Sequence, residues 1–237
     1  MRRIAFFGGS FDPPHRGHLA IAKAAADQFT LDEVLFAPVA QQPLKTAQEA
    51  TAFLHRYAMT VLATQADVRF VPSLLDAPRE SEPQPNYTVE TLERLRVSLA
   101  ESTEPTMLYT LLGADSWLDI ARWHQAARLL ALTDWIVAAR PGFSLVSAER
   151  ALPREVPAEQ VEHPSGPMLV LQHADGIRTR VYFLRSVWED LSATELRSSL
   201  VSGAADAELL PAPVWKYIRK TGLYKVGVPQ VSGLRPG

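Results

Sequence analysis

The sequence predicts an α/β protein built on a doubly wound parallel sheet with helices on both faces. Short apolar runs that are typical of buried strands alternate along most of the chain with longer Ala- and Leu-rich runs that are typical of helices. Such alternation favours parallel strands joined by crossover helices. Because ligands of these sheets bind beyond the carboxyl ends of the strands, we expect the functional residues in the loops that follow them.

The elements of the first half follow from local composition. Residues 4–7 form a continuous apolar run, which indicates a strand buried on both faces. Residues 17–29 are rich in Ala, Leu and Ile without proline, which indicates a helix. The same criteria predict the following elements: strands at 33–38 and 68–71, helices at 51–65 and 88–100, and loops at 39–50 and 72–87, the last with four prolines.

In the second half, a strand at 106–112 ends in Gly113-Ala-Asp115, and helical segments follow as far as residue 132. Asp175-Gly176 is a strong turn signal and predicts a β-hairpin between 169–173 and 179–184. The remaining expected elements are a strand at 134–139, an irregular stretch at 140–168 with one helix near 144–151, and helices at 192–201 and 214–221. We expect one domain over residues 1–225 and a mobile tail at 226–237.

Composition limits the function. The chain has 237 residues, 47% of them hydrophobic and 21% charged, which is the balance of a soluble globular protein. A net charge of -2 gives no global attraction to nucleic acid or to an acidic membrane. With no cysteine, disulfides, thiolate catalysis and cysteine-ligated metals are excluded. We expect a cytoplasmic protein without nucleic-acid or membrane partners, and the sequence leaves homo-oligomer formation open.

The stretch FFGGSFDPPHRGHLA, residues 6–20, joins the first strand to the first helix. Gly8 and Gly9 would let the backbone turn sharply and let a ligand approach it closely. The prolines that follow stiffen the turn and delay the helix. A helix beginning near His15 offers free N–H groups to an anion. His15 and His18 are three residues apart and therefore share one helix face, where both can donate to phosphate oxygens.

Other interpretations of this stretch stay open. The glycines alone would also suit an ordinary turn, and the histidines alone would suit a solvated surface or a metal pair. However, there is no HExxH motif and no cysteine to complete a zinc site. The chain also lacks GxxxxGK[ST] and GxGxxG, which argues against a P-loop NTPase and a conventional dinucleotide-binding dehydrogenase.

A second anion site is predicted at LSATELRS, residues 191–198. Ser192 and Glu195 have the spacing of a capping box, so a helix is expected to begin there. Thr194 then lies in the first turn and Arg197 one turn further on. Taken alone, this pattern favours a capped surface helix, although it also suits a grip for a polyphosphate.

Together these segments resemble the nucleotidyltransferase superfamily with the HxGH motif, which here is His15-Arg-Gly-His18. Residues 192–197 look like its second signature, (I/L)SSTxxR. Within the superfamily the chain most resembles the bacterial nicotinate-mononucleotide adenylyltransferases, over roughly residues 3–225. The segments that carry this resemblance are GGSFDP at 8–13, NYTVETL at 86–92, LGADS at 112–116 with Trp123 after it, ARPG at 139–142 and the closing motif at 210–224.

The resemblance implies a Rossmann-like fold and the transfer of AMP from ATP to nicotinate mononucleotide in NAD biosynthesis, giving deamido-NAD and pyrophosphate. It implies Mg²⁺ bound mainly through the ATP phosphates, with no protein metal ligand. The implied catalytic residues are His15, His18 and Arg197. The implied ATP-binding residues are Gly8, Gly9, Ser10, Phe11, Lys45, Ser192, Thr194 and Arg197. The implied mononucleotide-binding residues are Thr88, Asp115, Trp123 and Arg140.

Some positions have a plain structural alternative or depart from the family. Thr88 and Asp115 would suit helix caps, and Trp123 would suit core packing. The family's Asn and His after the second strand are missing from Pro38-Val-Ala-Gln-Gln-Pro-Leu-Lys45, although Lys45 keeps a cation. The rival functions are another adenylyl- or cytidylyltransferase, such as the phosphopantetheine enzyme, a non-catalytic nucleotide-binding protein and, more distantly, a zinc hydrolase.

Overall fold

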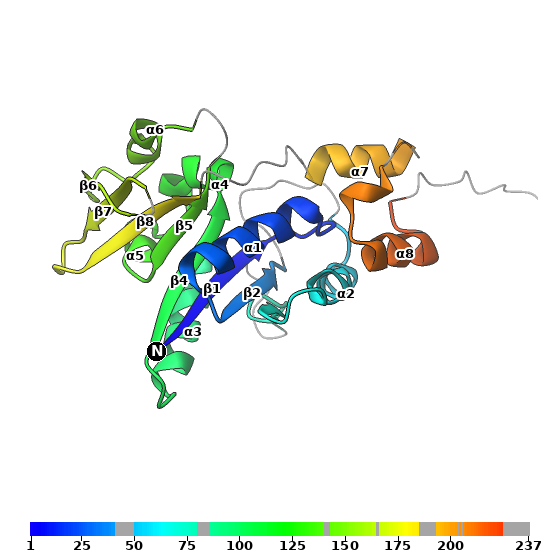
Figure 1. Ribbon diagram of the computed structural model, residues 1–237, viewed down its shortest axis with the longest axis horizontal. Helices are drawn as coiled ribbons and strands as arrows, with labels where there is room; N and C mark the ends of the chain where they lie inside the picture. The colour runs from blue at the N-terminus through cyan, green and yellow to red at the C-terminus, as the bar shows by residue number, and fades with distance from the viewer. Residues whose placement is uncertain are drawn as a thin grey trace, which may run out of the picture.

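A computed structural model describes residues 1–40, 50–79, 86–139, 143–164, 166–184, 193–202, 204 and 206–224. It contains one eight-stranded sheet with the order β3-β2-β1-β4-β5-β8-β7-β6 (Figure 1). In this spatial order, the neighbouring strands β3, β2, β1, β4, β5 and β8 are all parallel. Strand β7 is antiparallel to both of its neighbours, β8 and β6. The strands are β1 Arg2–Gly9, β2 Glu33–Pro38, β3 Phe70–Pro72, β4 Thr106–Gly113, β5 Asp134–Ala138, β6 Ala158–Val161, β7 Met168–Gln172 and β8 Arg178–Leu184.

The helices lie between the strands, largely where the sequence predicts them. The α-helices are α1 Arg16–Phe29, α2 Phe53–Thr64, α3 Thr88–Ala100, α4 Ala114–Leu118, α5 Ala126–Leu130, α6 Leu145–Arg150, α7 Ala193–Ser202 and α8 Ala212–Thr221. Two 3-10 helices, Ile120–Arg122 and Ala207–Leu209, complete the described set.

Strand β1 shows why helices cover both faces of the sheet. Ile4 and Phe6 are buried in one apolar cluster with α3, α4, α5 and α6. Ala5 and Phe7 are buried in the other with α1, which crosses in front of the sheet in Figure 1. Because successive side chains of a strand point to opposite faces, a strand that is apolar throughout must be covered on both sides. The predicted fold class is thus confirmed.

A third apolar cluster lies beside the sheet and joins α2, α7 and α8 (Figure 1). Met59 and Ala63 of α2 pack there with Leu196 of α7 and with Val214 and Ile218 of α8. Helix α7 follows the last strand, yet this packing places it near elements from the start of the chain. The cluster therefore brings the second predicted phosphate signature toward the first.

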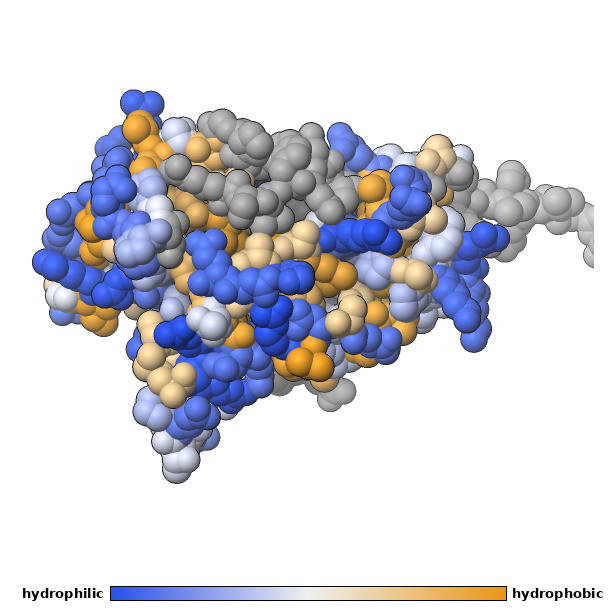
Figure 2. All heavy atoms as spheres, in the orientation of Figure 1, coloured by the Kyte–Doolittle hydropathy of each residue, from blue (hydrophilic) through white to orange (hydrophobic). Residues whose placement is uncertain are grey.

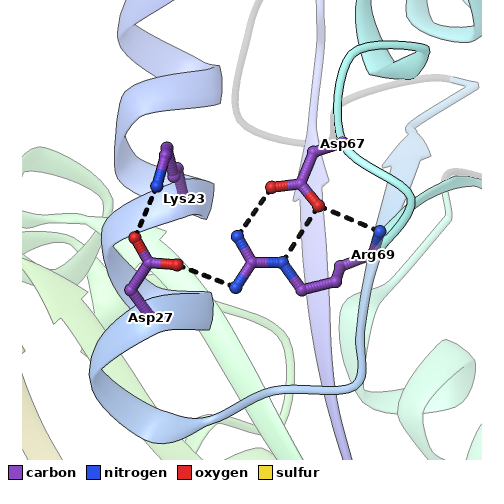
Figure 3. Close-up of polar contacts among 4 residues, drawn as sticks. All are labelled: Lys23, Asp27, Asp67 and Arg69. Atoms are coloured by element: carbon purple, nitrogen blue, oxygen red, sulfur yellow. Dashed lines mark hydrogen bonds and ion pairs between the residues drawn. The ribbon is translucent and has the colours of Figure 1, made fainter.

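An ion-pair cluster joins α1 to the segment before β3 (Figure 3). Arg69 donates to Asp67 at 2.6 Å and to Asp27 at 2.8 Å, and Lys23 donates to Asp27 at 2.6 Å. The hydrogen bonds that Arg69 donates to Asp67 and Asp27 raise its pKa above the ordinary value. Exposed pairs of this kind add little stability each, and here they link α1 to the segment that leads into β3.

Several expectations need correction. The stretch 140–168 contains an extra strand, β6, and the predicted hairpin of β7 and β8 extends it, so one edge of the sheet is antiparallel. The sequence AEQV of β6 is short and half polar, so it shows little strand periodicity. In the expected surface loop at 72–87, Asp76 turns inward and is buried. The expected tail at 226–237 lies outside the described residues.

The described surface facing the viewer in Figure 2 is largely hydrophilic, with apolar residues lying between the polar ones. The most exposed large apolar side chains include Val68 at 99% and Leu54 at 76%. Within the part of the chain that the structure describes, no helix combines the length and apolarity needed to cross a membrane.

Candidate active site

The candidate site lies at the carboxyl-end edge of the parallel strands. Gly9 at the end of β1 pairs with Pro38 at the end of β2, and Gly113 at the end of β4 pairs with Ala138 at the end of β5. Strand order reverses between β1 and β4, which is the switch point where α/β sheets bind ligands. The predicted glycine turn and the predicted Gly113-Ala-Asp115 segment therefore lie at the same edge, as the sequence indicates.

The turn after β1 is made by Phe11 rather than by the glycines. Phe11 has a φ of 45°, in the left-handed region, and its side chain is fully buried. A Cβ at Gly8 would lie 2.9 Å from Cε1 of Phe6, and one at Gly9 would lie 3.3 Å from Cζ of Phe11. The glycines thus make room for phenylalanine rings. Any contact of Phe11 with ATP would go through its backbone.

His15 and His18 come together at the start of α1. His15 is the N-cap with extended backbone, and α1 begins at Arg16, as the prolines predict. The two imidazole rings lie 3.7 Å apart between centroids. The ring of His18 also packs edge-on against Phe11, with 5.0 Å between centroids. The i, i+3 spacing therefore places both rings on one face, as predicted.

Both imidazoles are held neutral. Burial lowers the pKa of His15 to about 4. Burial, followed by repulsion from His15, lowers the pKa of His18 well below its ordinary value. The main-chain N–H of His15 donates to Nδ1 of His18 at 3.2 Å, which leaves Nε2 of His18 to carry the proton. Among the described atoms, Nδ1 of His15 is buried without a hydrogen-bond partner.

The second predicted phosphate segment contacts the first. Thr194 and Arg197 lie in the first turns of α7, and Nη2 of Arg197 donates to Oγ1 of Thr194 at 3.2 Å. Nη1 of Arg197 donates to the main-chain carbonyl of Asp12 at 2.9 Å. Residues 185 positions apart in sequence are thus joined beside the histidine pair. Thr194 is exposed and Arg197 is partly exposed, so both can reach a ligand.

Two of the predicted mononucleotide residues, Thr88 and Trp123, come from segments that an aromatic stack joins. Tyr87, the N-cap of α3, stacks on His124 with 4.1 Å between ring centroids. Thr88 follows Tyr87 as the first residue of α3, so it is not the cap residue that its position suggests. Trp123 precedes His124 and packs half-buried against the core. The stack therefore holds the start of α3 near Trp123.

Asp115 lies in the first turn of α4, directly after β4. Gly113 is the N-cap of that helix, so Asp115 does not cap it. Its side chain is exposed at the same edge as the end of β1. A carboxylate in this place can accept hydrogen bonds from a sugar hydroxyl.

Sequence reasoning missed two buried charged residues behind the site. Arg56 of α2 is 2% exposed and donates to main-chain carbonyls of Ser10, Thr51 and Ala40. Asp76 is 3% exposed and accepts from the hydroxyl of Thr91 at 2.5 Å. Burial raises the pKa of Asp76 to about 6. No local sequence pattern predicts that either residue is buried, because the groups that each one bonds to come mostly from distant parts of the chain.

The predicted residues Lys45, Arg140 and Ser192 lie outside the described residues, as does the departure from the family pattern at 41–45. Their roles stay predictions, and so do those of the residues described above.

Residues 6–199 match the family model described as cytidylyltransferase-like, which defines the class as a nucleotidyltransferase. The chain belongs to the nicotinate-nucleotide adenylyltransferase family. It is 35% identical over 225 residues to a Gloeobacter violaceus protein named "Probable nicotinate-nucleotide adenylyltransferase", covering 94% of this chain and 97% of that protein. A relative of the same name from Acidothermus cellulolyticus is 33% identical, covering 94% of each chain. The resemblance inferred from the motifs is confirmed.

Solved structures support the fold. The chain superposes on Plasmodium falciparum nicotinic acid mononucleotide adenylyltransferase complexed with NaAD with a TM-score of 0.67. The alignment covers 94% of this chain and 98% of that one at 19% sequence identity. At that identity the likeness concerns the fold, and it confirms the predicted Rossmann-like architecture.

Proposed function

We propose that the protein transfers AMP from ATP to nicotinate mononucleotide, releasing pyrophosphate and forming deamido-NAD. The observation that carries the proposal is the hydrogen bond from Arg197 to the carbonyl of Asp12. Because of this bond, the starts of α1 and α7 lie beside one short loop. Helix starts, imidazole N–H groups and a guanidinium are the donors that a polyphosphate requires. Family membership supports the choice of substrates.

In the reaction, a phosphate oxygen of the mononucleotide attacks the α-phosphorus of ATP. A new P–O bond forms as the bond between the α-phosphorus and the bridging β-phosphate oxygen breaks, and the electron pair leaves with pyrophosphate. The attacking phosphate is already ionised at neutral pH, so no general base is needed. The protein's contribution is to position two polyanions and to stabilise charge on the leaving group.

The donors would divide this work. His15 and His18, held neutral by burial, would each give an uncharged N–H to the phosphates. Arg197, with the hydroxyl of Thr194, would hold the β- and γ-phosphates with a permanent charge. The backbone of residues 8–11 would lie against the α-phosphate.

Mg²⁺ belongs to this proposal as a partner of the ATP phosphates. Within the described ranges, no group of three or more His, Asp or Glu side chains could hold a metal ion. Mg²⁺ keeps several of its waters and seldom needs an all-protein cage, so it would bind largely hydrated through phosphate oxygens. When bound, the ion would neutralise part of the charge on pyrophosphate.

On the mononucleotide side, Trp123 would stack on the pyridine ring and Asp115 would bind a ribose hydroxyl. The free N–H groups at the start of α3, together with the hydroxyl of Thr88, would donate hydrogen bonds to the nicotinate carboxylate. Lys45, Ser192 and Arg140 would add phosphate contacts. We place this activity in the cytoplasm, which agrees with the absence of cysteine.

The test is pyrophosphate release from Mg·ATP with nicotinate mononucleotide, nicotinamide mononucleotide or phosphopantetheine as acceptor. We expect release with the first, and weak or no release with the other two. Preference for phosphopantetheine would favour the rival adenylyltransferase. ATP binding without release for any acceptor would favour a non-catalytic nucleotide-binding protein.

A further inference from the structure

The carboxylate of Asp12 joins segments from distant parts of the chain. It is 4% exposed and lies in the loop between β1 and α1. One oxygen accepts from the main-chain N–H of Thr51 at 3.1 Å, and the other accepts from the hydroxyl of Tyr224. The main-chain carbonyl of the same residue accepts from Arg197. The described C-terminal segment is therefore bonded twice to one residue of the phosphate loop.

A buried cation, Arg56, interacts electrostatically with Asp12 and bonds to the same loop. The guanidinium of Arg56 donates to the carbonyl of Ser10 at 2.8 Å, to that of Thr51 at 2.8 Å and to that of Ala40 at 3.1 Å. Burial lowers the pKa of Arg56, and the charge of Asp12 opposes this effect. A buried carboxylate with a cation and hydrogen bonds around it is a fixed acceptor, because moving it would leave charges unpaired.

Tyr224 is suited to donate permanently to this acceptor. Burial, followed by the charge of Asp12, raises the pKa of Tyr224 above its ordinary value, so its hydroxyl keeps its proton. The residue follows α8, which ends at Thr221 and is capped by Gly222 with left-handed backbone. Helix α8 packs with α7 in the third apolar cluster through Ile218 and Leu196. The bond from Tyr224 to Asp12 therefore ties the packed pair of helices α7 and α8, which carries Arg197, to the loop after β1.

We propose that Asp12 and Tyr224 are positioning residues that hold Thr194 and Arg197 against the loop before ATP binds. The inference rests on the phosphate roles proposed for those residues. Holding the groups in place beforehand removes part of the entropy that binding would otherwise cost. None of these hydrogen bonds of Asp12 and Arg56 involves the start of α3 or Trp123, which would bind the mononucleotide. Loss of the Tyr224 hydroxyl should therefore weaken binding of ATP and leave that of the mononucleotide unchanged.

The test compares Tyr224→Phe with Tyr217→Phe. The hydroxyl of Tyr217 lies 2.8 Å from Nδ1 of His55 on α2, so the control loses a similar bond from the same C-terminal region without touching Asp12. Calorimetric titration would give the Kd of Mg·ATP without acceptor and that of nicotinate mononucleotide without ATP. For Tyr224→Phe we expect the Kd of Mg·ATP to rise about tenfold, because binding would then have to order the side chains that the bond holds in place.

We expect the Kd of nicotinate mononucleotide to stay within about twofold in both variants, and that of Mg·ATP to do so in Tyr217→Phe. The inference is overturned if Tyr224→Phe raises the Kd of Mg·ATP by less than about threefold, or if the mononucleotide or the control changes equally. These titrations need no turnover. A wild-type protein that binds ATP but releases no pyrophosphate would count against the proposed function and would leave this comparison valid.

Discussion

The starts of α1 and α7 would bind the same phosphates by different physical means. At α1 the donors are neutral imidazoles packed among phenylalanines, with His15 only 5% exposed. At α7 the donors are an exposed hydroxyl and a partly exposed guanidinium with a permanent charge. The first region supplies fixed geometry in a setting of low dielectric constant. The second supplies charge but needs other residues to position it.

The difference shows why one site would use both kinds of group. A hydrogen bond from a buried donor is strong because little water competes for it, and its geometry is set before substrate binds. A cation buried as deeply would be costly without a partner. Placing the cation at the surface and fixing it through the carbonyl of Asp12 avoids this cost.

The largest effect is expected at the buried region. His18→Ala should lower turnover about 10²-fold or more, as for the loss of a preorganised donor to developing charge. His18→Gln restores an N–H near the position of Nε2 and should recover part of the loss. Steady-state kinetics would measure both, with thermal unfolding as the check that each variant folds. Turnover of His18→Ala equal to that of the wild type would contradict the phosphate role of this residue.

A substitution of the buried Asp76 would measure how strongly burial disfavours its charged carboxylate. Its raised pKa of about 6, against an ordinary value of 3.8, means that folding favours the protonated carboxyl. The stability it contributes is complete below pH 3.8 and is lost as the pH rises through about 6. Asp76→Asn keeps an acceptor for Thr91 and should be more stable than the wild type by about 2–3 kcal/mol at pH 8.

Near pH 4 the two proteins should have nearly the same free energy of unfolding, because the wild-type carboxyl is then protonated in the folded state. Urea unfolding at both pH values would measure the difference. An equal difference at pH 4 and pH 8 would show that the effect of the substitution does not come from the charge of Asp76.

Gly8 at the end of β1 and Gly113 at the end of β4 differ in how tightly their surroundings are packed. In Gly8→Ala the new Cβ would meet the ring of Phe6, which is 1% exposed and cannot move aside freely. We expect a loss of about 1–3 kcal/mol in the free energy of unfolding. Gly113→Ala is the control, since no atom lies within 4 Å of its Cβ. Its change should stay within about 0.5 kcal/mol, and equal losses in both would argue against tight packing at Gly8.

The smallest effect is expected at the exposed region. Arg197→Lys keeps the charge but loses the fork that reaches both Asp12 and Thr194. The KM for Mg·ATP should rise about threefold to tenfold, with kcat less affected. Added salt should raise it further, because exposed charges are screened. A KM that is unchanged by the substitution and by salt would place Arg197 outside the phosphate site.

Much of the fold could be predicted because its signals are local. The helix over 88–100 agrees with α3 residue for residue, and the Asp175-Gly176 turn marks the hairpin of β7 and β8. The histidine pair follows from its spacing. The neutral state of the pair does not, because it depends on burial by residues such as Phe11.

The supporting residues of the site could not be predicted for the same reason. Arg56 is defined by carbonyls of three different loop residues, and Asp76 by a hydroxyl 15 positions away. Tyr224 lies 212 positions from the carboxylate that it contacts. Spacing along the chain does not reveal such pairs, which exist only once the sheet has brought their loops together.

The central claim, AMP transfer to nicotinate mononucleotide, is tested most directly by following the α-phosphorus. The protein would be incubated with Mg·ATP labelled at that atom, nicotinate mononucleotide and pyrophosphatase, and the products separated. For AMP transfer we expect the label to appear in deamido-NAD, with one pyrophosphate released for each molecule formed. Label found in AMP alone, or retained in ATP while the nucleotide stays bound, would contradict it.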